Sequence, residues 1–201
     1  LPAGPSEVMV LADNSARAEF VAADLLSQGE HGDDSQAILV CRTERFARQV
    51  TRAVEEQIRY LSRGEAIRNS LANSRIVLFD EEYKQIAFAN AYAPEHLIVS
   101  MRDAWGIAAK ITAAGSVFIG NYSPESAGDY ASGTNHTLPT GGWARACSGV
   151  NIDSFMRKIT FQELTRDGLD ALAPAITAMA EAEGLDAHAN AVRVRMKGGI
   201  L

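Results

Sequence analysis

The sequence predicts an α/β fold, in which a Rossmann-like, doubly wound and mostly parallel sheet is followed by a C-terminal helical tail. Short apolar runs alternate with longer segments in which apolar residues recur at helical spacing. Most of these runs are apolar throughout, which is typical of parallel strands buried on both faces. No GxGxxG sequence follows the first run. The dinucleotide fingerprint is therefore missing, and we expect an incomplete version of that fold.

Five apolar runs are expected to form the strands. The first, EVMVLAD, is closed by Asp13 and the polar residues after it, which favour the start of a helix. The second and third, AILVCR and RIVLFD, have the same apolar character. The fourth, HLIVSM, follows Pro94 and Glu95, and the fifth is GSVFIG. The expected strands are residues 7–13, 37–42, 75–80, 96–101 and 115–120.

The segments between these runs are expected to be helices that cover the sheet. The longest follows Thr43, a good N-cap residue, and carries its apolar residues on one face. These apolar residues are Phe46, Val50, Val54, Ile58 and Leu61. Another ends before Pro94, since the residue before a proline disfavours helix. The expected helices are residues 16–31, 44–63, 81–93 and 102–111.

The character of the chain changes after Gly120. Residues 121–151 are rich in Gly, Ser, Thr, Asn and Pro, and such a long segment is usually functional or disordered. Its aromatic residues and its histidine favour a functional role. Residues 165–196 become helical again, with a break at Gly184. We therefore expect a Rossmann-like α/β domain over residues 1–150, which carries the substrate and metal residues, and a helical tail over residues 151–201.

Composition narrows the classes of function. The chain has 201 residues, 47% of them hydrophobic and 22% charged, as in an ordinary globular protein. Its net charge of −6 argues against nucleic acid and anionic membranes as partners. Two distant cysteines, Cys41 and Cys147, fit a reducing compartment, so we expect a cytoplasmic protein. Because the chain begins with Leu1 and enters an apolar run almost at once, we expect it to be part of a longer polypeptide.

Two pairs of polar residues are candidates for chemistry. Gln28 and His31 are three apart at a predicted helix end and project to the same side, as metal ligands or as a solvated helix end. Glu95 and His96 stand at the start of the fourth strand, where the carboxylate suits a base toward water and the imidazole suits proton exchange with a hydroxyl. A polar strand edge explains this pair equally well. Adjacent residues of a strand point to opposite faces, so the two need not touch.

Two further pairs lie later in the chain. Asp129 and His136 occur in the long polar segment, where they suit either a metal or a polar ligand. Glu183 and His188 flank Gly184 in the tail. Their five-residue spacing across a helix break defines no common face, so this pair alone reads as surface.

Several segments closely resemble the histidinol dehydrogenase family. They are AGPSEVMVLAD, ADLLSQGEHGDDSQAILV, NAYAPEHL, AGSVFIGNYSPESAGDYASGTNHTLPT and AEGLDAHANAVRVRM. These segments run from Ala3 to Met196 in the family's order and approximate spacing. The resemblance implies a zinc-dependent, NAD-linked enzyme that oxidises L-histidinol through the aldehyde to L-histidine, the last step of histidine biosynthesis.

The resemblance also implies roles for individual residues. Glu95 would activate the water that attacks the aldehyde, and His96 would act as acid and base on the alcohol. The zinc ligands would be Gln28, His31, Asp129 and His188. The residues that contact the substrate would be Ser6, Gln28, His31, His96, Asp129, His136, Glu183 and His188.

Family members are about twice as long as this chain, which matches their C-terminal half. The N-terminal half carries much of the NAD site, so the resemblance assigns no cofactor-binding residue here. It implies an intertwined homodimer whose tail brings Glu183 and His188 to the partner's site. Three alternatives stay open: a non-catalytic dimerisation fragment, a dehydrogenase of another small amino or hydroxy alcohol, and a zinc hydrolase that uses Glu95.

Overall fold

The computed structural model describes residue 2 and residues 4–196 of the chain. The last five positions of the expected tail lie outside them. The chain divides into two compact units, Leu1–Met156 and Arg157–Leu201. Each unit is described by itself below.

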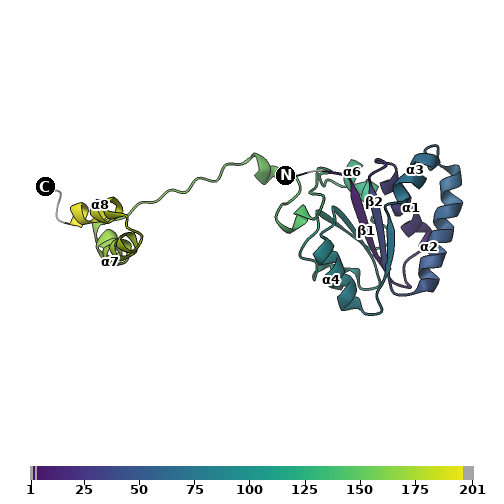
Figure 1. Cartoon of the computed structure of the whole chain (residues 1–201), viewed down its shortest axis with the longest axis horizontal. Helices are drawn as coiled ribbons and strands as arrows, with labels where there is room; N and C mark the ends of the chain where they lie inside the picture. The colour runs from purple at the N-terminus through teal and green to yellow at the C-terminus, as the bar shows by residue number, and fades with distance from the viewer. Residues whose placement is uncertain (1, 3, 197–201) are drawn as a thin grey trace. The chain divides into compact units, whose positions relative to one another are not determined.

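The first unit is built on a five-stranded parallel sheet with the order β3-β2-β1-β4-β5 (Figure 1). Its strands are β1 (Glu7–Ala12), β2 (Gln36–Cys41), β3 (Arg75–Leu78), β4 (His96–Ser100) and β5 (Ser116–Ile119). The chain runs outward from β1 to one edge and then returns to build the other edge. The expected α/β fold with a doubly wound parallel sheet is therefore confirmed.

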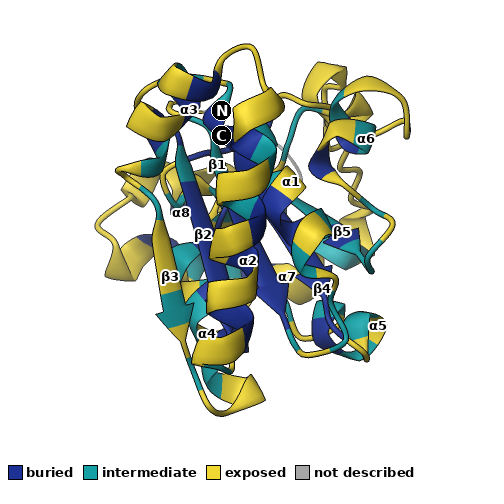
Figure 2. Ribbon diagram, turned by 90° about the vertical axis from the view of Figure 1, so that its right-hand side faces the viewer, coloured by how far each residue is buried: buried dark blue, intermediate teal, exposed yellow. Residues whose placement is uncertain are grey.

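Helices cover both faces of this sheet, because alternate residues of each strand point to opposite sides. On one face, Val8 and Val10 pack with residues of α1 (Ala18–Gly29) and α2 (Glu44–Gln57). On the other face, Met9 and Leu11 pack with residues of α4 (Glu82–Tyr92) and α5 (Ala104–Ala108). Figure 2 shows the buried strands behind α2, whose outer surface is exposed. The two layers explain why the strands are apolar throughout.

The expected helix over residues 44–63 is confirmed as far as Gln57 and is wrong beyond it. Helix α2 ends at Gln57, a short 3-10 helix η1 (Ile58–Tyr60) follows, and a further helix α3 (Gly64–Leu71) begins. A Cβ at Gly64 would lie 2.8 Å from the carbonyl oxygen of Ile58, so glycine allows a tight turn here. The turn packs Ile67 of α3 against Ile58 and Leu26. Leu61, expected on the buried face, is 37% exposed.

The polar segment after β5 is only partly irregular. It contains a short helix α6 (Glu125–Tyr130) and two 3-10 helices, η2 (Trp143–Arg145) and η3 (Ile152–Phe155). The second unit holds α7 (Arg166–Ala182) and α8 (Asp186–Met196), which pack on each other through residues that include Ala180 and Ala189. Among the described residues, no helix is both long and apolar enough to cross a membrane.

Candidate active site

The candidate residues gather at the amino ends of the strands. Ser6 directly precedes β1, Glu95 directly precedes β4, and His96 is the first residue of β4. Helix α1 returns from the carboxyl end of β1 to this edge, because it connects two parallel strands. Its last turn carries Gln28, and His31 follows it. Because β1 and β4 are neighbours in the sheet, Ser6 and Glu95 come into contact although they lie 89 residues apart in the sequence.

Glu95 is buried and held on one oxygen. Its Oε2 accepts hydrogen bonds from Ser6 Oγ at 2.7 Å and from the Glu7 backbone N–H at 2.9 Å. Its backbone carbonyl accepts from Ser116 N–H at 2.9 Å. A Cβ at Gly115 would lie only 2.5 Å from that carbonyl, so β5 can approach this closely only with glycine there. The carboxylate is therefore held at Oε2, and the backbone of the same residue is held by β5.

His96 is fixed by the same residue that holds Glu95. Its Nδ1 lies 3.1 Å from the Glu7 carbonyl oxygen, which can only accept, so Nδ1 carries the proton. Nε2 is then free to act as a base. It is buried without a hydrogen-bond partner and lies 3.6 Å from Asp129 Oδ1. Glu95 precedes the strand and does not follow its pleat, so its Oε2 comes within 3.6 Å of His96 Nδ1.

A second group of side chains joins the end of α1 to α6. His31, Glu125 and Asp129 each place a potential ligand atom within 4.8 Å of the other two. His31 is 43% exposed, and its Nε2 lies 3.7 Å from Glu125 Oε1. The interaction with Glu125 raises the pKa of His31 against the opposing effect of burial, and the charges of Asp129 and Glu95 add to the rise. The negative charges around His31 therefore favour a positive charge at this place.

Gln28 gives an independent sign that this place suits a ligand. It is fully buried, and neither its amide oxygen nor its amide nitrogen has a hydrogen-bond partner. Buried amides are almost always paired, so an orphaned one requires an explanation. Gln28 lies one turn before His31, and an amide oxygen can bind a metal. Together with the imidazole and carboxylate at this place, it makes a donor set that fits zinc.

Glu125 is a site residue that the sequence analysis missed. Its side chain is 1% exposed, Oε1 accepts from Ser27 Oγ at 3.3 Å, and Oε2 is buried without a partner. Burial, followed by the charge of Glu125, raises the pKa of nearby Asp24 to about 7. The four-residue spacing of Glu125 and Asp129 could have revealed a common helical face. This spacing was missed because a long polar segment, with no helix, is expected over residues 121–151.

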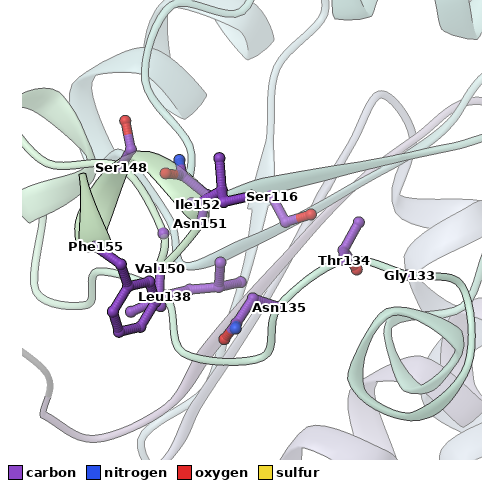
Figure 3. Close-up of a pocket in the computed structure, with 12 residues that line it drawn as sticks. Ser116, Gly133, Thr134, Asn135, Leu138, Ser148, Val150, Asn151, Ile152 and Phe155 are labelled. Carbon is purple, nitrogen blue, oxygen red and sulfur yellow. The ribbon is translucent and has the colours of Figure 1, made fainter.

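Two cavities adjoin these residues. The smaller, of about 350 Å³, lies between the end of α1 and α6. It is lined by Ser27, Glu30, His31, Arg63, Glu125, Ser126, Asp129 and Tyr130. The larger, of about 700 Å³, is lined mostly by small and amide residues such as Asn135 and Asn151 (Figure 3). Ser116 in its wall pairs in register with His96. The smaller cavity holds the ionisable groups, so we take it as the candidate metal site.

Three expected site residues are not among those that the first unit brings together. His136 is exposed in the segment after α6, and none of the contacts that join the cluster involves it. Glu183 and His188 belong to the second unit, where both are exposed around the turn between α7 and α8. Gly184 makes that turn with a φ of +72°, a conformation that favours glycine.

The sequence of this chain is similar to those of known proteins. The family model described as histidinol dehydrogenase matches residues 1–196. A histidinol dehydrogenase of Bacteroides fragilis (strain YCH46) is 58% identical over 197 residues, which cover 98% of this chain and 46% of that protein. One from Legionella pneumophila (strain Lens) is 51% identical over 196 residues, with the same coverage.

A solved structure is similar to this chain as well. The crystal structure of histidinol dehydrogenase from Elizabethkingia anophelis superposes with a TM-score of 0.93 at 56% identity, and the match covers 98% of this chain and 46% of that one. This chain thus spans about half the length of the relatives it matches. The match over its whole described length, and the identity well above half, show that the chain belongs to the histidinol dehydrogenase family.

Proposed function

We propose that this chain carries the substrate and metal half of an enzyme that oxidises L-histidinol through L-histidinal to L-histidine. The family membership supports this reaction. The observation that carries the proposal is the pair Glu95 and His96, buried side by side and each held by Glu7, next to the donors His31 and Asp129. Two successive oxidations need two different proton acceptors, and this pair supplies them.

In the first oxidation, His96 acts on the alcohol. Its unprotonated Nε2 takes the proton of the substrate hydroxyl while the C–H bond of the same carbon gives up a hydride, which leaves the aldehyde. The hydrogen bond from Nδ1 to the Glu7 carbonyl keeps the ring in the tautomer that this requires. Asp129, 3.6 Å from Nε2, stabilises the imidazolium that forms.

In the second oxidation, Glu95 acts on water. It takes one proton from a water molecule whose oxygen adds to the aldehyde carbon, and the resulting anion of the hydrate gives up its hydride to form the carboxylic acid. Ser6 and the Glu7 N–H occupy Oε2 of Glu95. We assign the proton transfer to its other oxygen, Oε1.

Two cofactors belong to this proposal. Zinc would be held by Gln28, His31, Asp129 and His188, and would supply a positive charge that binds and orients the substrate's nitrogen atoms. NAD is proposed as the hydride acceptor from the family alone. The turn between β1 and α1 contains no glycine, so its residues do not fit a pyrophosphate, and we assign none of them to NAD.

We also propose that two copies of the chain form an intertwined homodimer in the cytoplasm. The tail of each copy, residues 151–201, would give Glu183 and His188 to the partner's site, while Ser6 and His136 would contact the substrate. Co-expression of Asp129→Asn and His188→Asn chains tests the crossing. Neither variant alone should bind zinc tightly, but a mixed dimer contains one site with all its ligands and should regain about one zinc. Failure to regain zinc would place His188 in its own chain's site.

The direct test of the reaction is a chimera in which this chain replaces the matching 197 residues of the Bacteroides fragilis relative. We expect it to form about two NADH for each L-histidine made from L-histidinol, since each oxidation releases one hydride. Amino alcohols without an imidazole should react poorly. A folded chimera that binds zinc but oxidises only such alcohols would contradict the proposed substrate.

A further inference from the structure

Glu125 is a buried carboxylate for which the proposed mechanism has no use. It begins α6, one turn before the proposed zinc ligand Asp129, and its side chain is 1% exposed. Burial of a carboxylate is unfavourable unless it is paired and hydrogen-bonded. The contacts of its Oε1 are with Ser27 and His31, both at the end of α1. Glu125 therefore faces the helix end that carries the proposed metal ligands Gln28 and His31.

Ligating histidines usually need a partner of this kind. An imidazole that binds a metal through one nitrogen donates the N–H of its other nitrogen to a carboxylate or carbonyl, which fixes the tautomer and the ring orientation. His31 is partly exposed and stands beyond the last residue of α1, so its own helix does not hold the ring. In the structure, Nε2 of His31 faces Glu125 Oε1 at 3.7 Å. This separation is that of an ion pair, and a shift of about half an ångström makes it a hydrogen bond.

From this geometry, and resting on the proposed function, we propose that Glu125 is the positioning residue of His31. It accepts the Nε2 proton of His31 and leaves Nδ1 as the nitrogen that binds the metal. Ser27 donates to the same carboxylate oxygen and keeps it in place. Since Glu125 and Asp129 share α6 while Gln28 and His31 belong to the end of α1, this contact also fixes the distance between the two parts of the metal site.

The test compares Glu125→Gln with the unchanged chain in two measurements. In the first, zinc affinity is determined by competition with a chelator, and we expect it to fall 10- to 100-fold, as for other carboxylates behind a ligating histidine. In the second, the ¹⁵N shifts of the His31 ring are followed without metal as the pH is raised until the ring is neutral, because Glu125 raises the pKa of His31. The unchanged chain should show the Nε2–H tautomer, and Glu125→Gln should show a mixture. Glu19→Gln removes a carboxylate from the exposed start of α1 and serves as the control.

A second variant, Ser27→Ala, keeps the inference testable even where Glu125→Gln does not fold. Ser27→Ala keeps the carboxylate and removes its donor, so a smaller loss of zinc affinity in the same direction is expected. Unchanged zinc affinity and an unchanged His31 tautomer in Glu125→Gln would overturn the inference and leave the proposed function standing. A changed absorption spectrum of bound Co²⁺ in Glu125→Gln, with loss of affinity far beyond 100-fold, would overturn it in favour of direct ligation. Absence of zinc binding in the unchanged chain would overturn the metal site itself.

Discussion

The two ends of the parallel sheet differ in how their polar groups are paired. Ligands of doubly wound sheets usually bind at the carboxyl ends of the strands. Here the carboxyl end has a cavity of about 560 Å³ lined by charged residues that include Asp13, Arg42 and Arg102. The amino end has the cavity of about 350 Å³ between α1 and α6 and the cavity of about 700 Å³ that Ser116 lines. The candidate site nevertheless lies at the amino end.

At the carboxyl end, Asp13 and Arg42 already have hydrogen-bond partners. Asp13 accepts from the backbone N–H groups of Ser15 and Arg102, at 2.8 and 3.0 Å. Against the effect of burial, a hydrogen bond from the Ser15 hydroxyl, followed by these two backbone bonds, lowers the pKa of Asp13. Arg42 donates from Nε to the backbone carbonyl of Asp80 at 3.1 Å. These interactions close the turns that follow the strands, so Asp13 and Arg42 do not call for a ligand.

At the amino end, buried polar atoms lack partners. They include both amide atoms of Gln28, Nε2 of His96 and Oε2 of Glu125. A fold tolerates such groups when they serve binding or catalysis, because each one left unpaired destabilises the protein by about 1–3 kcal/mol. Both amide atoms of Gln85, in the first turn of α4, are also buried without a partner. The amino end therefore differs in bringing an unpaired amide, imidazole and carboxylate together, and not in being the one place with such atoms.

The largest effect is expected for Glu95→Gln in the chimera with the Bacteroides fragilis relative. The amide keeps the shape but cannot accept a proton from water, so oxidation of the aldehyde should slow by at least about 100-fold. The first oxidation should change much less, because His96 serves it. Single-turnover reactions started from L-histidinol and from L-histidinal separate the two steps. An unchanged rate from the aldehyde would refute the role of Glu95.

A smaller effect, on the stability of the fold, is expected for Gly115→Ala. The added Cβ would lie 2.5 Å from the Glu95 carbonyl oxygen, which is backbone and cannot move away cheaply. We expect a loss of about 1–3 kcal/mol in the free energy of unfolding, measured with urea, together with weaker zinc binding. Gly32→Ala is the matched control, since its nearest neighbour is the side chain of Asp34. Equal stability of the two variants would contradict the close approach of β5 to Glu95.

The smallest effect concerns pH. The pKa of Asp24, about 7 in the folded protein, lies above its ordinary value of 3.8. Between these values the folded state holds a proton that the unfolded state has lost, so stability falls as pH rises through this window and is level above it. Asp24→Asn cannot ionise and should be more stable than the unchanged chain at pH 8 by about 1 kcal/mol, allowing for solvent screening.

Urea unfolding at pH 4.5 and pH 8, with a chelator present, measures this difference. The exposed Asp33→Asn is the control. If Asp24→Asn and the unchanged chain lose the same stability between the two pH values, burial and the charge of Glu125 do not raise the pKa of Asp24.

The sheet could be predicted from the sequence because its strands are apolar on both faces and separated by clear helix signals. The site could be predicted less well. Resemblance alone grouped Gln28, His31 and Asp129, and the hydrogen bond between Ser6 and Glu95 joins positions that no local pattern connects. Glu125 was missed because a short helix without a side-chain N-cap, begun after Pro124, leaves little trace in a polar segment. Helix α3 was missed because the helical pattern before it runs on past Gln57.

The central claim is that a metal binds at the amino end of the sheet through this chain's own residues. The most direct measurement is a calorimetric titration of zinc into the metal-free 201-residue chain and its variants Asp129→Asn and Asp80→Asn. The two variants remove the same kind of charge from opposite ends of the sheet. We predict tight binding of about one zinc per chain, lost in Asp129→Asn and kept in Asp80→Asn. No tight binding in the unchanged chain, or binding that survives Asp129→Asn, would contradict the claim.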